Sequence, residues 1–316
     1  MPKVDCVRGG LSGARRPRPK ERCAKTVIYA IGDIHGQYAM LEALLAKLTD
    51  LPIQDDDTFV FLGDYVDRGD DSRAVLERLQ RWREEHPNTI FLRGNHEQLM
   101  LDVIDAPADI DRAERARRML IWLQNGGSEA LRSYSAPGFR AWLEACGGTR
   151  TRLSLKSLFD LKESFERWIE VIPEDDVSFM RATQMEFVTP RYHFVHAGLL
   201  TPGQTWATEG WSIDPRLWMR EPFVSSRADF GGRTVVFGHT PQRSGRPLVH
   251  PNKIGLDTGA VFGGPLTAGI FDPDGAAPPR FIQAPYVRTI TSFSPPGISA
   301  SSAARRRASS ARSSRK

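Results

Sequence analysis

The stretch that decides the fold is Thr58–Gly69, which reads Thr-Phe-Val-Phe-Leu-Gly-Asp-Tyr-Val-Asp-Arg-Gly. Five residues of strand-forming character end at Gly63, and three charged side chains follow at once, those of Asp64, Asp67 and Arg68. A continuous apolar run of this length is typical of a strand that is buried on both faces of its sheet. In α/β proteins, ligands and catalytic groups gather where such strands end. The stretch therefore indicates a buried strand that leads into a functional site, although a structural ion-pair turn would leave the same pattern.

The same design of strand, polar turn and amphipathic helix occurs three times in the first third of the chain. Lys25–Ile31 leads into Gly-Asp-Ile-His-Gly, which ends at Gly36, and Thr89–Leu92 leads into Arg-Gly-Asn-His-Glu, which ends at Glu97. A helix over Gln98–Ile104 is expected to complete the third unit. Alternation of this kind predicts βαβ units and an α/β fold.

Residues 105–185 interrupt the alternation with a mostly helical insert. Asp111–Leu123 is predicted to form a helix that Asn125-Gly126-Gly127 terminates, and two more helices are predicted over Phe139–Ala145 and Leu155–Val171. Strand patterns return afterwards at Tyr192–Leu200, Thr234–Thr240, Lys253–Thr258, Leu266–Asp272 and Pro279–Ala284. We therefore expect one catalytic domain over 26–290, with the helical insert over about 105–185.

The positive charge of the chain lies at its two ends. The chain has 316 residues and a net charge of +5. Residues 1–25 carry eight Lys or Arg against two acidic residues, and residues 291–316 carry six against none. The segment between them has 29 basic and 36 acidic residues, so a role in nucleic-acid binding is expected at most for the tails. Composition predicts a disordered basic arm over 1–25 and a disordered Ser/Arg-rich tail over 291–316.

Composition also narrows the class of protein. With 40% hydrophobic and 26% charged residues, the chain is typical of a globular protein. Its three scattered cysteines are too few for a disulfide framework. No apolar run approaches the length of about 18 residues that a membrane span needs. We therefore expect a cytoplasmic enzyme that makes no use of a membrane, and the sequence leaves its oligomeric state open.

Side chains that can bind a metal follow five of the predicted strands. They are those of Asp33 and His35, Asp64, Asn95, His196 and His239. Oxygen and imidazole ligands without a thiolate suit divalent Mn, Fe or Zn. Six side chains exceed what one ion usually needs, so Asp64 could bridge two ions that stabilise the attacking and leaving oxygens of an in-line displacement. A lone histidine at a strand end is more often a core or surface residue, but five strands that end in the same way predict a metal site.

Five linked motifs resemble the signature series of the phosphoprotein phosphatase family of calcineurin-like metallophosphoesterases. The motifs are Gly32-Asp33-Ile34-His35-Gly36, Gly63-Asp64-Tyr65-Val66-Asp67-Arg68-Gly69, Arg93-Gly94-Asn95-His96-Glu97, His196-Ala197-Gly198 and Gly238-His239-Thr240. The resemblance covers about Thr26 to Phe271. Leu217–Glu221 and Asp257–Phe262 are similar to the compact branch of bacterial and bacteriophage lambda phosphatases. The resemblance implies a sandwich of two central mixed β-sheets flanked by helices.

The resemblance also implies a role for each matching position. One divalent ion would be held by Asp33, His35 and Asp64, and the other by Asp64, Asn95, His196 and His239. Mn is the first choice for both ions, with Fe or Zn as alternatives.

Four further residues would act on the substrate, two in proton transfer and two in phosphate binding. His96 would protonate the leaving alkoxide, with Asp67 holding its imidazole. Arg68 and Arg220 would bind phosphate oxygens, for which the planar guanidinium group is suited. For Arg220, a solvated surface arginine remains an alternative.

The function implied is that of a phosphoserine and phosphothreonine protein phosphatase, in which a metal-bridging hydroxide attacks the phosphomonoester directly. The alternative within the superfamily is a symmetrical bis(5'-nucleosyl)-tetraphosphatase. Asp67-Arg68-Gly69 and Glu97 favour the phosphoprotein branch, so the expected partner is a phosphorylated protein. The insert also holds four arginines that could bind extra phosphates, although acidic residues between them favour a solvated helix face: Arg112, Arg115, Arg117 and Arg118. A purely binding role through the basic tails is the non-enzymatic alternative.

Overall fold

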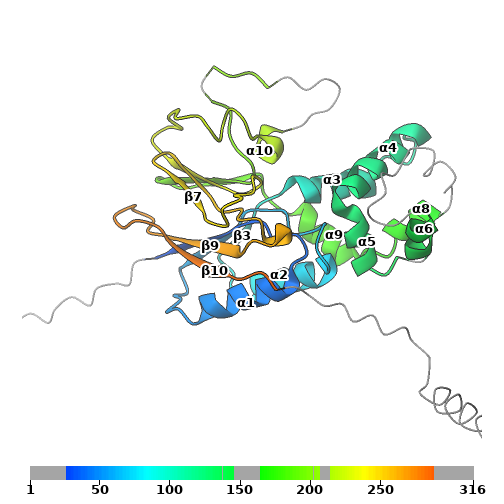
Figure 1. Ribbon diagram of the computed structural model, residues 1–316, viewed down its shortest axis with the longest axis horizontal. Helices are drawn as coiled ribbons and strands as arrows, with labels where there is room; N and C mark the ends of the chain where they lie inside the picture. Colours follow the sequence, from blue (N-terminus) through cyan, green and yellow to red (C-terminus); the bar gives the residue numbers. More distant parts are fainter. Residues whose placement is uncertain (1–25, 137, 146–163, 202, 207–213, 288–316) are drawn as a thin grey trace, which may run out of the picture.

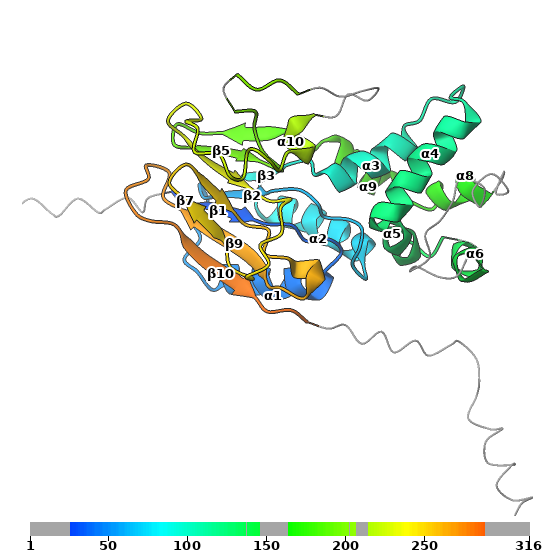
Figure 2. The same cartoon turned by 45° about the horizontal axis from the view of Figure 1, so that its top comes forward.

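The computed structural model describes residues 26–136, 138–145, 164–201, 203–206 and 214–287, and both predicted tails lie outside these ranges. The strands form two five-stranded sheets (Figures 1 and 2). The first has the order β10-β9-β1-β2-β3 and consists of β1 (Ile28–Ile31), β2 (Thr58–Phe61), β3 (Thr89–Phe91), β9 (Leu266–Phe271) and β10 (Arg280–Ala284). The second has the order β4-β5-β6-β8-β7 and consists of β4 (Glu186–Val188), β5 (Tyr192–Val195), β6 (Thr234–Phe237), β7 (Leu248–His250) and β8 (Lys253–Gly255).

Both sheets are mixed. β1, β2 and β3 run parallel, whereas β9 and β10 are antiparallel neighbours on the far side of β1. In the second sheet β5, β6 and β8 are parallel, and the edge strands β4 and β7 are antiparallel. The prediction of an α/β sandwich with two mixed sheets flanked by helices is confirmed. The short edge strands β4 and β7 were not predicted.

The helices of the structure are grouped by their place in the chain. Those next to the first sheet are α1 (Tyr38–Thr49), α2 (Ser72–Glu85) and α3 (Asn95–Ile104). The region of the insert contributes α4 (Arg112–Trp122), the π-helical turn η1 (Leu123–Gly127), α5 (Ser128–Ser133), α6 (Phe139–Ala145), α8 (Ser164–Ile169) and α9 (Glu174–Arg181). The later part of the chain adds α10 (Pro215–Trp218) and the short 3₁₀-helix η2 (Ala260–Phe262). Figures 1 and 2 show α4, α5, α6 and α8 together at one end of the molecule, beyond the sheets.

The continuous apolar run of β2 reflects two separate cores. Phe59 and Phe61 join the core that the first sheet forms with α1 and α2. Val60 and Leu62 point the other way, into the core between the two sheets. Successive side chains of a strand alternate between its faces, so a strand covered on both sides must be apolar throughout. Among the described residues, no helix is long and apolar enough to cross a membrane.

One prediction about a helix end was wrong, and a second was confirmed in part. The third motif helix begins at Asn95 and not at Gln98, because the carboxylate of Glu97 accepts the backbone N–H of Gly94 at 2.9 Å and so starts the helix earlier. The helix predicted over Asp111–Leu123 does end before Asn125-Gly126-Gly127, since α4 stops at Trp122, but these residues do not end the helical region. Gly126 has a φ of 110°, which kinks the chain, and α5 begins immediately afterwards. The first nine residues of the helix predicted over Leu155–Val171 lie outside the described ranges.

Candidate active site

The predicted metal ligands come together at the ends of five strands. Because β1, β2 and β3 are parallel and β5 and β6 are parallel, the turns that follow them lie on one side of the sandwich. The six residues are at most 6% exposed, so their side chains are largely removed from water. They are Asp33, His35, Asp64, Asn95, His196 and His239. Buried charged and polar groups of this kind must be paired with one another or with an ion.

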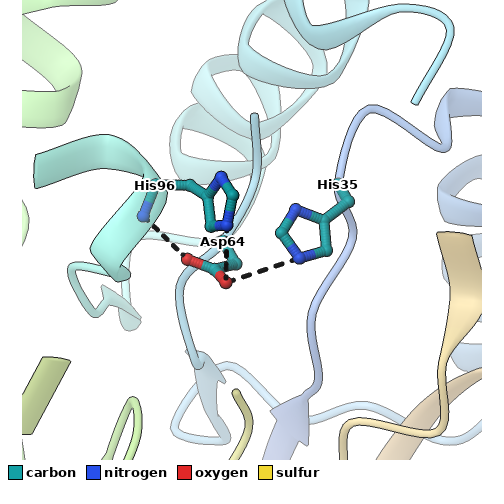
Figure 3. Close-up of side chains that lie close together, drawn as sticks. All are labelled: His35, Asp64 and His96. Atoms are coloured by element: carbon teal, nitrogen blue, oxygen red, sulfur yellow. Dashed lines mark hydrogen bonds and ion pairs between the residues drawn. The ribbon is translucent and has the colours of Figure 1, made fainter. Parts of the chain in front are cut away.

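Asp64 occupies the centre of the site, as Figure 3 shows for two of its neighbours. Its Oδ2 lies 3.4 Å from Nε2 of His35 and 4.0 Å from Nε2 of His96, while its Oδ1 lies 3.4 Å from Nε2 of His196. Two groups of possible ligands share this carboxylate, one with His35 and His96 and the other with His196 and His239. Burial opposes ionisation of Asp64, but the surrounding imidazoles outweigh it and hold its pKa well below the usual range.

The histidines present acceptor atoms to the centre of the site. The Nδ1–H of His35 donates to the carbonyl of Val66 at 3.0 Å, and that of His196 donates to the carbonyl of Leu62 at 2.8 Å. Burial lowers the pKa of both imidazoles and so favours their neutral form, in which the lone pair lies on Nε2 because Nδ1 carries the proton. In His196 this lone pair faces Oδ1 of Asn95 at 3.1 Å, which is also an acceptor. Acceptors that converge in this way fit a divalent cation, and the carbonyl partners fix the ligating tautomer.

Asp33 lies beside these groups and not within them. Both of its carboxylate oxygens accept the backbone N–H of His239, at 3.1 and 2.9 Å. Burial, together with the charges of Asp257 and Asp64, raises the pKa of Asp33 well above its usual value. Buried carboxylates that repel one another are an environment that a cation would stabilise. Asp257, which had not been singled out as a site residue, thereby joins the acidic cluster.

His96 is held in one orientation by Asp67. Its Nδ1–H donates to Oδ2 of Asp67 at 2.7 Å, and both residues are fully buried. Within the part of the chain that the structure describes, Nε2 of His96 has no hydrogen-bond partner. Burial opposes protonation of this imidazole, but Asp64 and Asp67 outweigh it and raise its pKa. His96 can therefore carry a proton on Nε2 that no protein group in this region accepts.

Arg68 is anchored to the helical insert. Its backbone N–H donates to the carbonyl of Gly126 at 3.0 Å, and its Nε donates to the carbonyl of Asn125 at 3.3 Å. Its Nη1 lies 2.9 Å from Nε2 of His35, and its Cζ lies 5.7 Å from the centre of the Phe262 ring. These insert contacts were missed by the sequence analysis, which had assigned Asn125 and Gly126 to a helix end. The signal for them was a Gly-Gly pair inside a helical region.

Arg220 lies on the opposite side of the site. Its Nε is 3.2 Å from Nε2 of His239, and its Nη2 donates to the carbonyl of His239 at 3.3 Å. The turn that follows Arg220 is tied to β8 by the buried ammonium group of Lys253, which donates to backbone carbonyls of residues 223, 224 and 226. The two guanidinium groups thus flank the histidine groups, where they could bind the oxygens of one phosphate.

Glu97 organises the loop that contains Asp64. Its carboxylate accepts the backbone N–H groups of Asp64 at 2.9 Å, Tyr65 at 2.7 Å, Val66 at 3.2 Å and Gly94 at 2.9 Å. Two acidic oxygens thereby satisfy four buried donors that would otherwise lack partners. The motif glutamate is therefore part of the framework of the site.

The backbone of the site is strained. Six non-glycine residues of the described chain have a positive φ, and five of them are candidate site residues: His35, Asp64, Asp67, Arg68 and His239. Residues in this sparsely populated region persist only where the surrounding contacts hold them, and they gather at functional sites.

We expect Glu97→Gln to destabilise the fold by about 2–4 kcal/mol, because its amide NH₂ would face donors that now bond to a carboxylate oxygen. Urea-induced unfolding of the metal-free protein measures this change. Glu77→Gln is the matched control, since Glu77 makes an exposed ion pair with Arg73 and should change stability by less than about 0.5 kcal/mol. Equal stabilities of the two variants would contradict the framework role.

Comparisons with known proteins agree with this geometry. A family model for the calcineurin-like phosphoesterases matches residues 26–254. The chain is 30% identical to serine/threonine-protein phosphatase 1 of Salmonella typhimurium, over 76% of this chain and 89% of that protein. It is 27% identical to the symmetrical bis(5'-nucleosyl)-tetraphosphatase of Bordetella parapertussis, over 77% of this chain and 92% of the relative.

The fold has a counterpart among solved structures. A crystal structure assigned as a candidate diadenosine tetraphosphatase aligns with a TM-score of 0.50 and 22% identity, and the alignment covers 84% of this chain and 96% of that one. This likeness concerns the fold alone. Together, the family model and the Salmonella relative show that the chain belongs to the calcineurin-like phosphoesterase family.

Proposed function

We propose that the chain is a metal-dependent protein phosphatase that hydrolyses phosphoserine and phosphothreonine. The observation that carries this proposal is the His96–Asp67 pair, with its 2.7 Å hydrogen bond and an Nε2 atom that has no partner in the described chain. The alkoxide of serine or threonine is a poor leaving group, so its departure requires a proton donor. A positioned general acid contributes about 10²–10⁴-fold to such a reaction.

The metal ligands proposed are those that the motifs suggested. Asp33, His35 and Asp64 would hold one ion, and Asp64, Asn95, His196 and His239 would hold the other. Bound divalent ions, with Mn as first choice and Fe or Zn as alternatives, would lower the pKa of water and offset the charge of the phosphate. The alternative that the geometry offers is ligation by His96, which lies in one group with His35 and Asp64.

Arg68 and Arg220 would bind the phosphate from two sides. A phosphomonoester has three unsubstituted oxygens, enough for two guanidinium groups and a metal site at once. His96 would then face the ester oxygen, and its proton would pass from Nε2 to the departing alkoxide while Asp67 holds the Nδ1–H. The partner proposed is accordingly a phosphorylated protein.

Hydrolysis of a dinucleoside tetraphosphate is the second candidate, because relatives of both kinds match the chain over similar lengths. Such a substrate would need additional positive charge for its neighbouring phosphates. The arginines of α4 could supply this charge. Nε of Arg117 and Nε of Arg118 both bond to Glu114, at 2.8 and 3.1 Å, so part of their charge is offset within the helix. This arrangement favours the protein phosphatase.

The test is the ratio of kcat/KM for a phosphothreonine peptide to that for diadenosine tetraphosphate, measured with Mn²⁺ in one buffer. We expect a ratio above one. A ratio below one would overturn the substrate assignment and would leave the metal site unaffected. The Asp64→Asn variant, prepared in parallel, controls for contaminating phosphatases because it should be inactive on both substrates.

A further inference from the structure

Trp122, the last residue of α4, joins the helical insert to the Asp67–His96 pair. Trp122 is fully buried. Its Nε1–H donates to Oδ1 of Asp67 at 3.0 Å, and Nε1 lies 3.2 Å from Oδ2. The Oδ2 atom accepts the Nδ1–H of His96 at 2.7 Å. The indole thus fixes the rotation of the carboxylate that orients the imidazole.

The turn that carries Asp67 needs support of this kind. Asp67 and Arg68 are consecutive non-glycine residues with φ values of 70° and 65°, which few L-residues adopt. The insert contributes a contact to each of them. The Trp122 indole bonds to the side chain of Asp67, and the carbonyl of Gly126 accepts the backbone N–H of Arg68 at 3.0 Å. One short segment of the insert therefore reaches both the proton-donating pair and the phosphate-binding arginine.

Gly127 leaves room for the indole. A Cβ atom at this position would lie 2.6 Å from both Cε2 and Nε1 of Trp122, well inside van der Waals contact. Any side chain larger than hydrogen would push the indole away from its present place. Two residues of the same segment, far from Asp67 in sequence, are thus needed for the contact with its carboxylate.

We propose that Trp122 is a positioning residue for proton transfer. By holding Asp67, it keeps the imidazole of His96 turned so that Nε2 faces the ester oxygen of a bound phosphomonoester. Trp122 itself would touch neither the substrate nor a metal ion. The inference rests on the proposed function in one respect, that His96 is the proton donor.

The test replaces Trp122 by Phe, which keeps an aromatic ring in the core and removes the N–H. For a phosphoserine peptide, kcat should fall about 10-fold to 100-fold with KM little changed, as expected for losing a hydrogen bond to a charged group. For para-nitrophenyl phosphate the loss should stay below about threefold, because this leaving group scarcely needs a proton. Gly127→Ala displaces the indole, so it should also lower the rate on the phosphoserine peptide much more than the rate on para-nitrophenyl phosphate.

Trp82→Phe is the matched control. The Nε1 atom of Trp82 is also buried, but it has no hydrogen-bond partner in the described chain, so removal of its N–H should leave both rates unchanged. A second readout is independent of turnover. In the metal-free full-length protein, the Nδ1–H proton of His96 should give a downfield NMR signal. This proton should exchange with solvent faster in Trp122→Phe than in the original protein, and at an unchanged rate in Trp82→Phe.

The outcomes separate the two proposals. A faster-exchanging His96 signal with a selective loss on phosphoserine supports the positioning role. A faster-exchanging signal with equal losses on both esters supports positioning and counts against His96 as the acid. An unchanged signal, whether the rates are normal or uniformly reduced, overturns the role of Trp122.

Discussion

Replacement of Asp64 by Asn is expected to abolish turnover and to release bound metal. One carboxylate faces both histidine groups, with Oδ2 toward His35 and Oδ1 toward His196, each at 3.4 Å. An amide has only one oxygen and no charge, so it cannot serve both groups at once. Metal ions contribute several kcal/mol to phosphoryl-transfer transition states, which corresponds to a loss of at least about 10³-fold in rate.

The measurement is metal content after dialysis, together with the rate on para-nitrophenyl phosphate. We expect two equivalents of Mn²⁺ in the original protein and fewer in Asp64→Asn. Asp67→Asn is the matched control, since Asp67 lies in the same turn, is equally buried and belongs to neither histidine group. It should retain both ions while losing activity on phosphoserine. Two equivalents of metal in Asp64→Asn, with a near-normal rate, would exclude a bridging role.

The part of the site that could be predicted from the sequence is the part that follows regular strands. From Phe59 to Leu62 the chain is apolar because β2 is covered on both faces, so the end of this run at Gly63 was visible without a structure. Asp64 follows directly. The parallel order of β1, β2 and β3 then places the corresponding turns side by side, which is why residues 31 positions apart could be grouped.

The contacts that cross from the insert were not predictable in this way. Trp122 lies 55 residues from Asp67, and the apolar spacing of α4 indicates only that its side chain faces the core. Whether a core tryptophan also donates its N–H to a catalytic turn depends on how the helix is placed, which periodicity does not encode. The same holds for Lys253, whose bonds to the turn after Arg220 join segments that no local pattern connects.

Asp33 shows a further limit of sequence reasoning. Its motif predicts that it is a ligand, but no local signal indicated that its carboxylate would accept the backbone N–H of His239 with both oxygens. A carboxylate can rotate about one bond between such a contact and an ion. Burial and the charges of Asp257 and Asp64, which come from distant parts of the chain, raise the pKa of this carboxyl group.

His96→Asn is expected to slow hydrolysis of a phosphoserine peptide by about 10²–10⁴-fold while both metal ions stay bound. The imidazole is committed through Nδ1 to Asp67, and its Nε2 lies farther from Asp64, at 4.0 Å, than that of His35, at 3.4 Å. The loss should be much smaller for para-nitrophenyl phosphate, whose anion leaves without a proton.

Metal content decides between the two roles that the geometry allows for His96. If His96 is the acid, its replacement leaves the metal content unchanged. If His96 is a ligand beside His35 and Asp64, its replacement releases one ion. His193→Asn is the control, because His193 bonds to Glu186 at 2.7 Å outside both groups and should affect neither rates nor metal. If His96→Asn binds one ion fewer and slows both esters equally, His96 is a ligand, and the proton must come from another group.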